Sequence, residues 1–328
     1  MRRRSWAWAR FAGVAVTLVV LLWRLGTGPF LDGIRTVDAQ ALAAATIIAV
    51  PITVSSAWRW KVVARGLGID LPLRAAVAAY YRSQFLNVTL PGGVVGDVHR
   101  GISNGRDVSD VGLGLRAVAW ERAAGQVVQA ILTVGVLIAL PSPVRSHMPL
   151  AAVALGLLVA GAVLLARVRP SGGRAPLTRL RNAVAGDIQG GLVARRAWPG
   201  IALASAVALA GHVLTFVIAA RTAGVGAPVA RLLPLALLVM LAMVLPSVAG
   251  WGPREGVAAW AFAAAGLGAD GGVATAVVFG VMVFVASLPG AVVLVVAWAH
   301  RGRGPEQPET APLRRPQAAV RPDRVPHA

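Results

Sequence analysis

The sequence predicts an all-α, polytopic membrane protein with six to eight transmembrane helices, two Gly/Pro-broken segments and a possible inverted repeat. Hydrophobic residues make up 57% of the chain and charged residues 14%, with a mean hydropathy of +0.70, whereas a soluble domain carries about a quarter charged residues. Five stretches have no charged residue and are long enough, or nearly so, to cross the ~30 Å hydrocarbon layer. Two further segments place proline, glycine and charge between apolar stretches.

The five clear stretches are Ala41–Trp58, Ala123–Leu140, Leu150–Ala166, Ile201–Ala220 and Gly271–Ala299. A shorter stretch, Phe11–Trp23, follows tryptophan and arginine residues that suit a membrane interface. An arginine-rich start before an apolar run also describes a signal peptide, but no Ala-x-Ala-like site follows Trp23, so we expect an uncleaved first span. Leu232–Val248 is apolar and runs into the second broken segment. We expect Ser287–Gly290 to kink the last span.

The charge distribution predicts the topology. The net charge is +19, and basic residues concentrate before the first span, in 59–122, in 167–196 and after His300. If these regions are cytoplasmic, the pattern obeys the positive-inside rule. We therefore expect both termini in the cytoplasm and contact with anionic lipid headgroups, and no binding of nucleic acid.

Four regions are not clean spans. Leu73–Leu86 mixes apolar, aromatic and arginine residues, and either lies in the interface or dips into the protein. The arginine-rich connection 167–199 is expected to include a surface helix. Residues 1–300 then form one transmembrane domain, and 301–328, rich in Pro and Arg, form a disordered basic cytoplasmic tail. Because both termini are expected on the same side, the number of membrane crossings must be even. The region 232–268 can therefore either re-enter by one face or cross twice.

The first broken segment is LPGGVVGDVHR, Leu90 to Arg100. A non-helical backbone survives within a membrane only when it is buried in protein or lines a wet cavity. Asp97, His99 and Arg100 follow the break and are candidate substrate-binding residues, because a helix beginning near Asp97 could receive a phosphate at its positive end. The alternative is a turn at the cytoplasmic surface in which Asp97 caps a helix. The residues that break the backbone are Pro91, Gly92, Gly93 and Gly96.

The second broken segment is LPSVAGWGPREG, Leu245 to Gly256. Arg254 and Glu255 open its following helix as an ion pair, since Pro253 suits the first turn and Glu255 suits the positive end. The alternative is that the pair anchors a helix end at the interface. The residues that break the backbone here are Pro246, Gly250, Gly252 and Pro253.

Each half of the chain places one broken segment between two spans, which suggests an inverted repeat with one break entering from each face. Glu121 and Arg122 open the span at 123–140; they either stay at the interface or turn inward to pair with Asp97 or Arg100. His212 lies within Ile201–Ala220, where a helix–helix hydrogen bond is the favoured role.

The sequence lacks the residues and motifs that several kinds of chemistry require. The chain has no cysteine, which excludes disulfides and thiolate metal sites. It also lacks a Walker A motif and the GxSxG and HExxH motifs. We therefore expect neither a metal nor another cofactor, and a transporter rather than an enzyme.

Together the motifs resemble a flippase-like transmembrane family named for the membrane domain of lysylphosphatidylglycerol synthase. The family pattern has LPGG-x-GGD-x-x-R, then Glu-Arg at the start of a span, then LP-x-x-x-GxG-x-REG. Here these correspond to Leu90–Arg100, Glu121-Arg122 and Leu245–Gly256, although Val95 stands where the pattern has glycine. The resemblance implies a bacterial inner-membrane protein that translocates a phospholipid or polyprenyl lipid. It does not imply lysyl transfer, because the chain has only the membrane part.

The leading hypothesis is thus a lipid flippase in which Arg100 and Arg254 neutralise a lipid phosphate, with Asp97, Glu121 and Glu255 holding the arginines. The alternative is a membrane component or partner of a lipid-modifying glycosyl- or aminoacyl-transferase.

Overall fold

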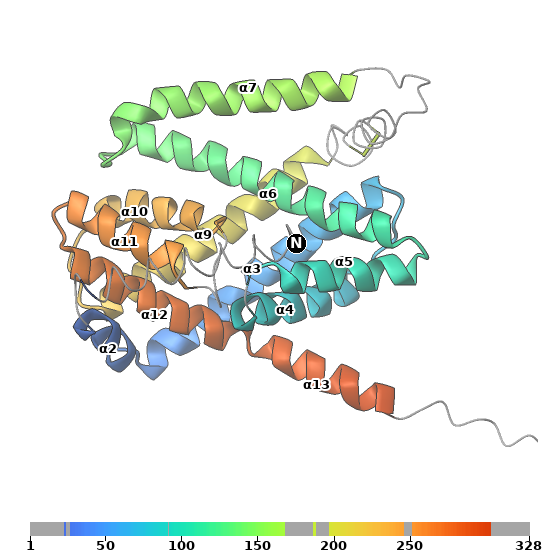
Figure 1. The fold of residues 1–328 in the computed structure, drawn as a ribbon, viewed down its shortest axis with the longest axis horizontal. Coiled ribbons are helices and arrows are strands. Elements are labelled where there is room, and N and C mark those ends of the chain that lie inside the picture. Colours follow the sequence, from blue (N-terminus) through green and yellow to red (C-terminus); the bar gives the residue numbers. More distant parts are fainter. Residues whose placement is uncertain are drawn as a thin grey trace, which may run out of the picture.

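Figure 1 shows the computed structural model, which describes residue 23 and residues 27–90, 92–167, 186–187, 197–245 and 251–302. The elements in these ranges are helices, which confirms the predicted all-α class. Nearly all of the expected span Phe11–Trp23, most of the connection 167–199 and nearly all of the tail lie outside the described residues. Five helical stretches of the described chain are long and apolar enough to cross a membrane: Ala39–Gly66, Val111–Ala139, Arg145–Ala162, Trp198–Thr222 and Ala269–Ala299.

The first half of the chain builds a span, a hairpin of two shorter helices and a second span. Helix α3, Ala39–Gly66, starts where the Asp38 carboxylate accepts the Ala41 backbone N–H at 2.6 Å. Helices α4, Leu73–Thr89, and α5, Val95–Asp107, form the hairpin around the first break. Helix α6, Val111–Ala139, is capped in the same way as α3, by Asp110.

The second half repeats this order. Helix α9, Trp198–Thr222, is followed by the shorter α10, Val229–Ala242, and α11, Pro253–Ala264, and then by α12, Ala269–Ser287. In Figure 1, α4 and α5 enter from the right and turn near the middle, whereas α10 and α11 enter from the left. The spans α3 and α9 also run in opposite directions, as do α6 and α12. The repeat is therefore inverted, as the order of spans and breaks suggested.

The lengths of the hairpin helices decide between re-entry and crossing. At 1.5 Å per residue, α10 with 14 residues and α11 with 12 are about 21 and 18 Å long. Both are shorter than the ~30 Å hydrocarbon layer. The region 232–268 is thus a re-entrant hairpin. Helix α4 dips into the protein rather than lying on the surface, because it packs against α3, α5, α12 and α13.

Two further helices flank the two repeats in the sequence. The last predicted span ends as α12 at Ser287 and continues as α13, Pro289–Gly302, so the expected kink at Ser287–Gly290 is a break. The short helix α2, Gly28–Arg35, packs on α12.

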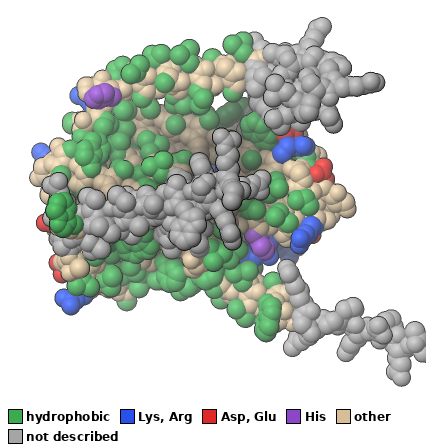
Figure 2. All heavy atoms as spheres, in the orientation of Figure 1, with side chains coloured by type: hydrophobic (Ala, Val, Ile, Leu, Met, Phe, Trp, Pro, Cys, Tyr) green, Lys and Arg blue, Asp and Glu red, His purple; other side chains and the backbone are tan. Residues whose placement is uncertain are grey.

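Helix α7, Met148–Arg167, follows the 3-10 turn Arg145–His147 and packs along α6 at the edge of the molecule (Figure 1). Four of its leucines are exposed: Leu150, Leu157, Leu158 and Leu164. On the face shown in Figure 2, hydrophobic side chains dominate the middle of the described surface and charged ones lie toward the two ends. Such a surface suits lipid around the middle and water at the ends.

Glycines let each hairpin lie directly on the span that follows it. Gly114 on α6 faces the backbone of α5, where an added Cβ would lie 2.4 Å from the Gly101 carbonyl oxygen. Gly272 on α12 faces α11 in the same manner, with the Ala258 carbonyl oxygen 2.3 Å from an added Cβ. Each is the fourth residue of its helix. The same backbone contact is therefore built twice, once in each repeat.

We predict that Gly272→Ala destabilises the protein by about 1 to 3 kcal/mol, because the new methyl group forces α11 away from α12. Thermal unfolding of the protein in detergent measures this change. Gly156→Ala on α7 is the matched control, since an added Cβ there meets nothing within 4 Å. Equal unfolding midpoints for the two variants would contradict the close packing of the second hairpin.

Candidate functional site: a charged network beside a central cavity

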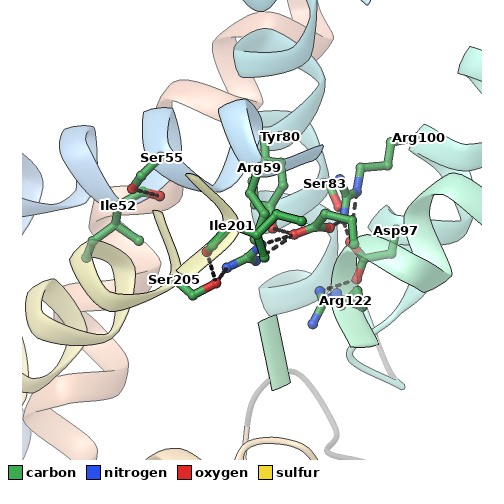
Figure 3. A network of polar contacts seen from close by, with 11 residues as sticks. Ile52, Ser55, Arg59, Tyr80, Ser83, Asp97, Arg100, Arg122, Ile201 and Ser205 are labelled. Carbon is green, nitrogen blue, oxygen red and sulfur yellow. Dashed lines mark hydrogen bonds and ion pairs between the residues drawn. The ribbon is translucent and has the colours of Figure 1, made fainter. Parts of the chain in front are cut away.

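The carboxylate of Glu121 on α6 is fully buried and accepts hydrogen bonds from three other helices. Its Oε1 accepts from Arg59 on α3, from Nε at 2.9 Å and Nη2 at 2.5 Å, and from the Tyr80 hydroxyl on α4 at 3.2 Å. Its Oε2 accepts from Arg100 Nη2 on α5 at 2.6 Å. Figure 3 shows these partners converging. The carboxylate therefore joins α3, α4, α5 and α6, and it has the partners that a charge within a membrane needs.

Asp97 is the second anion of the network and stands in the first turn of α5. Its Oδ1 accepts from Ser83 Oγ and from Arg100 Nε, each at 3.0 Å. Its Oδ2 accepts from Asn87 Nδ2 at 2.9 Å and from Arg122 Nη2. One carboxylate thus ties the start of α5 to α4 and to α6. This is the inward arrangement of Asp97, Arg100, Glu121 and Arg122 that the sequence left open.

The glycines of the first break make this arrangement possible. Gly92 and Gly93 have φ angles of 105° and 66°, a region that favours glycine. Gly96 lies against α4 so closely that an added Cβ would stand 2.0 Å from the Ser83 carbonyl oxygen. Its N–H donates to the Asn87 side-chain oxygen at 2.8 Å, which satisfies a free amide at the start of α5.

A cavity of about 300 Å³ lies beside the network, between α3, α4, α6, α9 and α12. The charged side chains among its described lining residues are those of Arg59 and Arg122. Gly93 brings the first break to the cavity wall, and Met243, directly after α10, brings the end of that helix there, just before the second break. Uncharged polar and titratable side chains also line it, among them Gln84, Asn87, Gln126, Gln129, Ser205 and His212.

The network is not electrically neutral. Among the described residues that it joins, three guanidinium groups (Arg59, Arg100 and Arg122) face two carboxylates (Asp97 and Glu121). One positive charge is left in excess. Arg122 contacts the network through Asp97 and has a side chain that is 43% exposed. The excess charge is thus available at the cavity.

Arg59 is the charged residue among the described members of the network that the sequence prediction missed. It lies one residue beyond the predicted span Ala41–Trp58, because α3 continues to Gly66. Its Nη1 donates to Ser205 Oγ on α9 at 3.0 Å. Gly125 on α6 makes room for it, since a Cβ there would lie 2.8 Å from the Arg59 Cζ. An arginine between two tryptophans at the end of a span suggests an interface anchor, so the sequence carried no signal for this role.

The second break holds its own buried ion pair. Glu255 Oε1 accepts from Arg254 Nε at 2.9 Å and Nη2 at 2.5 Å, while Oε2 accepts the Gly252 N–H at 2.7 Å. Gly252 has a φ angle of 114°, and Pro253 begins α11 as predicted. Gly280 on α12 leaves space for the guanidinium, because an added Cβ would lie 2.3 Å from Arg254 Nη2. The pair is buried within the protein and does not anchor a helix end at the surface.

The structure does not bring all the candidate residues to one place. Arg100 and Arg254 belong to separate networks, because the guanidinium of Arg100 is bound by Asp97 and Glu121 and that of Arg254 by Glu255. His99 is half-buried on α5. Pro91, Pro246 and Gly250 lie outside the described residues.

We predict that Glu121→Gln destabilises the protein by about 3 kcal/mol, because the change leaves Arg59 and Arg100 buried with one counter-charge fewer. Thermal unfolding in detergent measures the loss. Asp270→Asn, an exposed acid-to-amide change on α12, is the control and should leave the midpoint unchanged.

Adding Arg59→Met to Glu121→Gln returns the network to one excess positive charge. We expect the double variant to be more stable than Glu121→Gln alone, because the two residues are in contact and their effects do not add. Strictly additive losses would contradict the pairing.

Comparison with known proteins identifies the family. The sequence model of one family, the lysylphosphatidylglycerol synthase TM region, matches residues 8–290. No curated protein matches the chain significantly. The matched region contains both broken segments, the charged network and the central cavity. The chain is a multi-pass membrane protein that belongs to the lysylphosphatidylglycerol synthase transmembrane-region family.

Proposed function

We propose that this protein is a flippase that moves a phospholipid, or a related lipid-linked anion, between the leaflets of a bacterial inner membrane. The observation that carries the proposal is the central cavity with one excess positive charge, which lies against the first break and the end of α10. Such a site matches a headgroup with one phosphodiester charge. The family name supports a lipid as cargo, because it refers to an aminoacylated phospholipid.

The size of the cavity supports a headgroup as its occupant. Ligand pockets in proteins begin at about 300 Å³, and this cavity has about that volume. The acyl chains can stay in the surrounding lipid while the headgroup enters. Amides and hydroxyls on the wall, such as Gln84, Gln126 and Ser205, offer hydrogen bonds that replace those of water.

The inverted repeat supports a mechanism of alternating access. In transporters built this way, one repeat moves against the other around a fixed site near the bilayer midplane. Here the two hairpins enter from opposite ends (Figure 1), and Gly93 of the first break and Met243 at the end of α10 line the cavity. In this mechanism Arg122 contacts the phosphate, while Arg59 and Arg100 hold Glu121 in place. The pair Arg254–Glu255 positions the second hairpin.

The topology proposed with this function follows the positive-inside rule. The end of the molecule that contains the α5–α6 connection faces the cytoplasm, together with both termini. A partner transferase remains a prediction that no contact in the described structure tests.

We expect Arg122→Gln to slow lipid translocation by about tenfold or more, because it removes a charge-assisted hydrogen bond to the phosphate. The measurement uses proteoliposomes that contain a fluorescent phosphatidylglycerol, with an impermeant reductant bleaching the outer leaflet over time. Arg116→Gln is the matched control. Arg116 lies on the same helix with the same 43% side-chain exposure, but it pairs with Asp187 outside the network.

Arg100→Ala and Arg254→Ala extend the experiment to the residues that hold the two hairpins. Both are expected to slow translocation, since each removes the cation of a buried pair. Wild-type rates in Arg122→Gln, Arg100→Ala and Arg254→Ala together would refute the flippase assignment.

A further inference from the structure

A second, smaller cavity of about 170 Å³ lies between α3, α4, α5 and α13. None of its described lining residues also lines the central cavity, and α4 contributes to both. The residues that matter for its chemistry are Trp60, Arg82, Arg100, Ser103, Asn104 and Asp107. The function proposed above makes no use of this cavity.

Three N–H donors on the wall of this cavity have no hydrogen-bond partner within the described part of the chain. They are Trp60 Nε1, Arg100 Nη1 and Asn104 Nδ2. The residues are 1%, 1% and 6% exposed. Buried polar atoms in folded proteins nearly always have a partner, and a buried donor without one destabilises the fold. Three such donors around one cavity therefore indicate a ligand that accepts hydrogen bonds.

The charge and type of the lining groups indicate an anion. An indole and a guanidinium can only donate hydrogen bonds, so these two sites cannot be satisfied by a donor. Arg82 and Asp107 carry opposite charges on the wall. Arg100, which is paired with Asp97 and Glu121, adds a cationic group with one nitrogen that has no partner among the described residues. A small ligand that is rich in acceptors and negatively charged fits this set.

Arg100 is held so that its free nitrogen cannot turn elsewhere. Its Nε and Nη2 donate to Asp97 and Glu121, as described above. Its Cζ lies 4.7 Å from the Trp60 ring centroid and 4.4 Å from that of Tyr80, so both rings stabilise the cation. The third nitrogen is thereby fixed at the small cavity. Such preorganisation lowers the cost of binding.

We propose that this small cavity binds a phosphate-type oxyanion at a site separate from the central cavity. The ligand is either free phosphate or the phosphate of a lipid in the adjacent leaflet, since both offer the same acceptor oxygens. Arg100 links the small cavity to the charged network, because its Nη1 has no partner in the described ranges while its Nη2 donates to Glu121.

The test measures binding to the full chain in two arms. In the first, the protein in phosphate-free, lipid-depleted detergent solution is dialysed to equilibrium against radiolabelled inorganic phosphate. In the second, native mass spectrometry counts the lipids retained after extraction from vesicles of phosphatidylglycerol. Binding in the first arm identifies free phosphate, and retention in the second alone identifies a lipid phosphate.

Two variants remove the unpartnered donors. Trp60→Phe deletes the indole N–H, and Asn104→Asp replaces the amide with a carboxylate that repels an anion. Each should weaken binding by about tenfold or more. Trp298→Phe, an exposed tryptophan on α13, is the control for the first change and should bind as wild type. Thermal unfolding identifies a variant that fails to fold, and the other variant then carries the test.

Arg122→Gln separates this proposal from the flippase proposal. Binding that survives Arg122→Gln but is lost in Trp60→Phe and Asn104→Asp supports the second site. Binding lost only in Arg122→Gln places the anion in the central cavity, which overturns the second site and leaves the flippase proposal intact. If neither arm detects a ligand that depends on Trp60 or Asn104, water fills the small cavity and the proposal is wrong.

Discussion

The buried carboxylate of Glu121 is the constraint on which the first repeat depends. A charge within a membrane must have a partner, because no water is present to solvate it. Here the partners come from three other helices, which positions α3, α4 and α5 against α6. Asp97 then fixes the start of α5, and through Arg122 it extends the network to the central cavity. The ion pairs that hold the helices together and the proposed ligand site therefore use the same charged residues.

The second repeat also buries charge in its hairpin, but it does so with a single ion pair. Arg254 and Glu255 are neighbours in sequence and neutralise each other, whereas the first repeat combines five charged residues. This second hairpin packs into an apolar core that includes three phenylalanines, of which Phe216 and Phe262 pack edge to face with ring centroids 6.2 Å apart. The excess charge is thus confined to one side of the inverted repeat. A flippase with this asymmetry would hold its headgroup mainly through the first repeat.

Much of the fold could be predicted from the sequence, because hydropathy and backbone breakers are local signals. The five long spans, both broken segments and the interruption at Ser287–Gly290 follow from residue types alone. The charged network was only partly predictable. Asp97, Arg100, Glu121 and Arg122 were candidates, but their alternatives at the interface could be excluded only by their burial and contacts. Arg59 was missed because its partners lie 62 and 146 residues away in the sequence.

By itself, then, the sequence determined the membrane class, the order of spans and breaks and the residues able to carry charge, since each depends on composition along a short segment. The tertiary structure alone decided which charges meet. It placed Arg100 and Arg254 in separate ion-pair networks and brought Arg59 into contact with Glu121. It also left three N–H donors beside a second cavity without a partner among the described residues. The physical reason is that pairing of buried charges depends on helix packing in three dimensions. In this protein that packing is set by close glycine contacts between helices, such as those at Gly114 and Gly272.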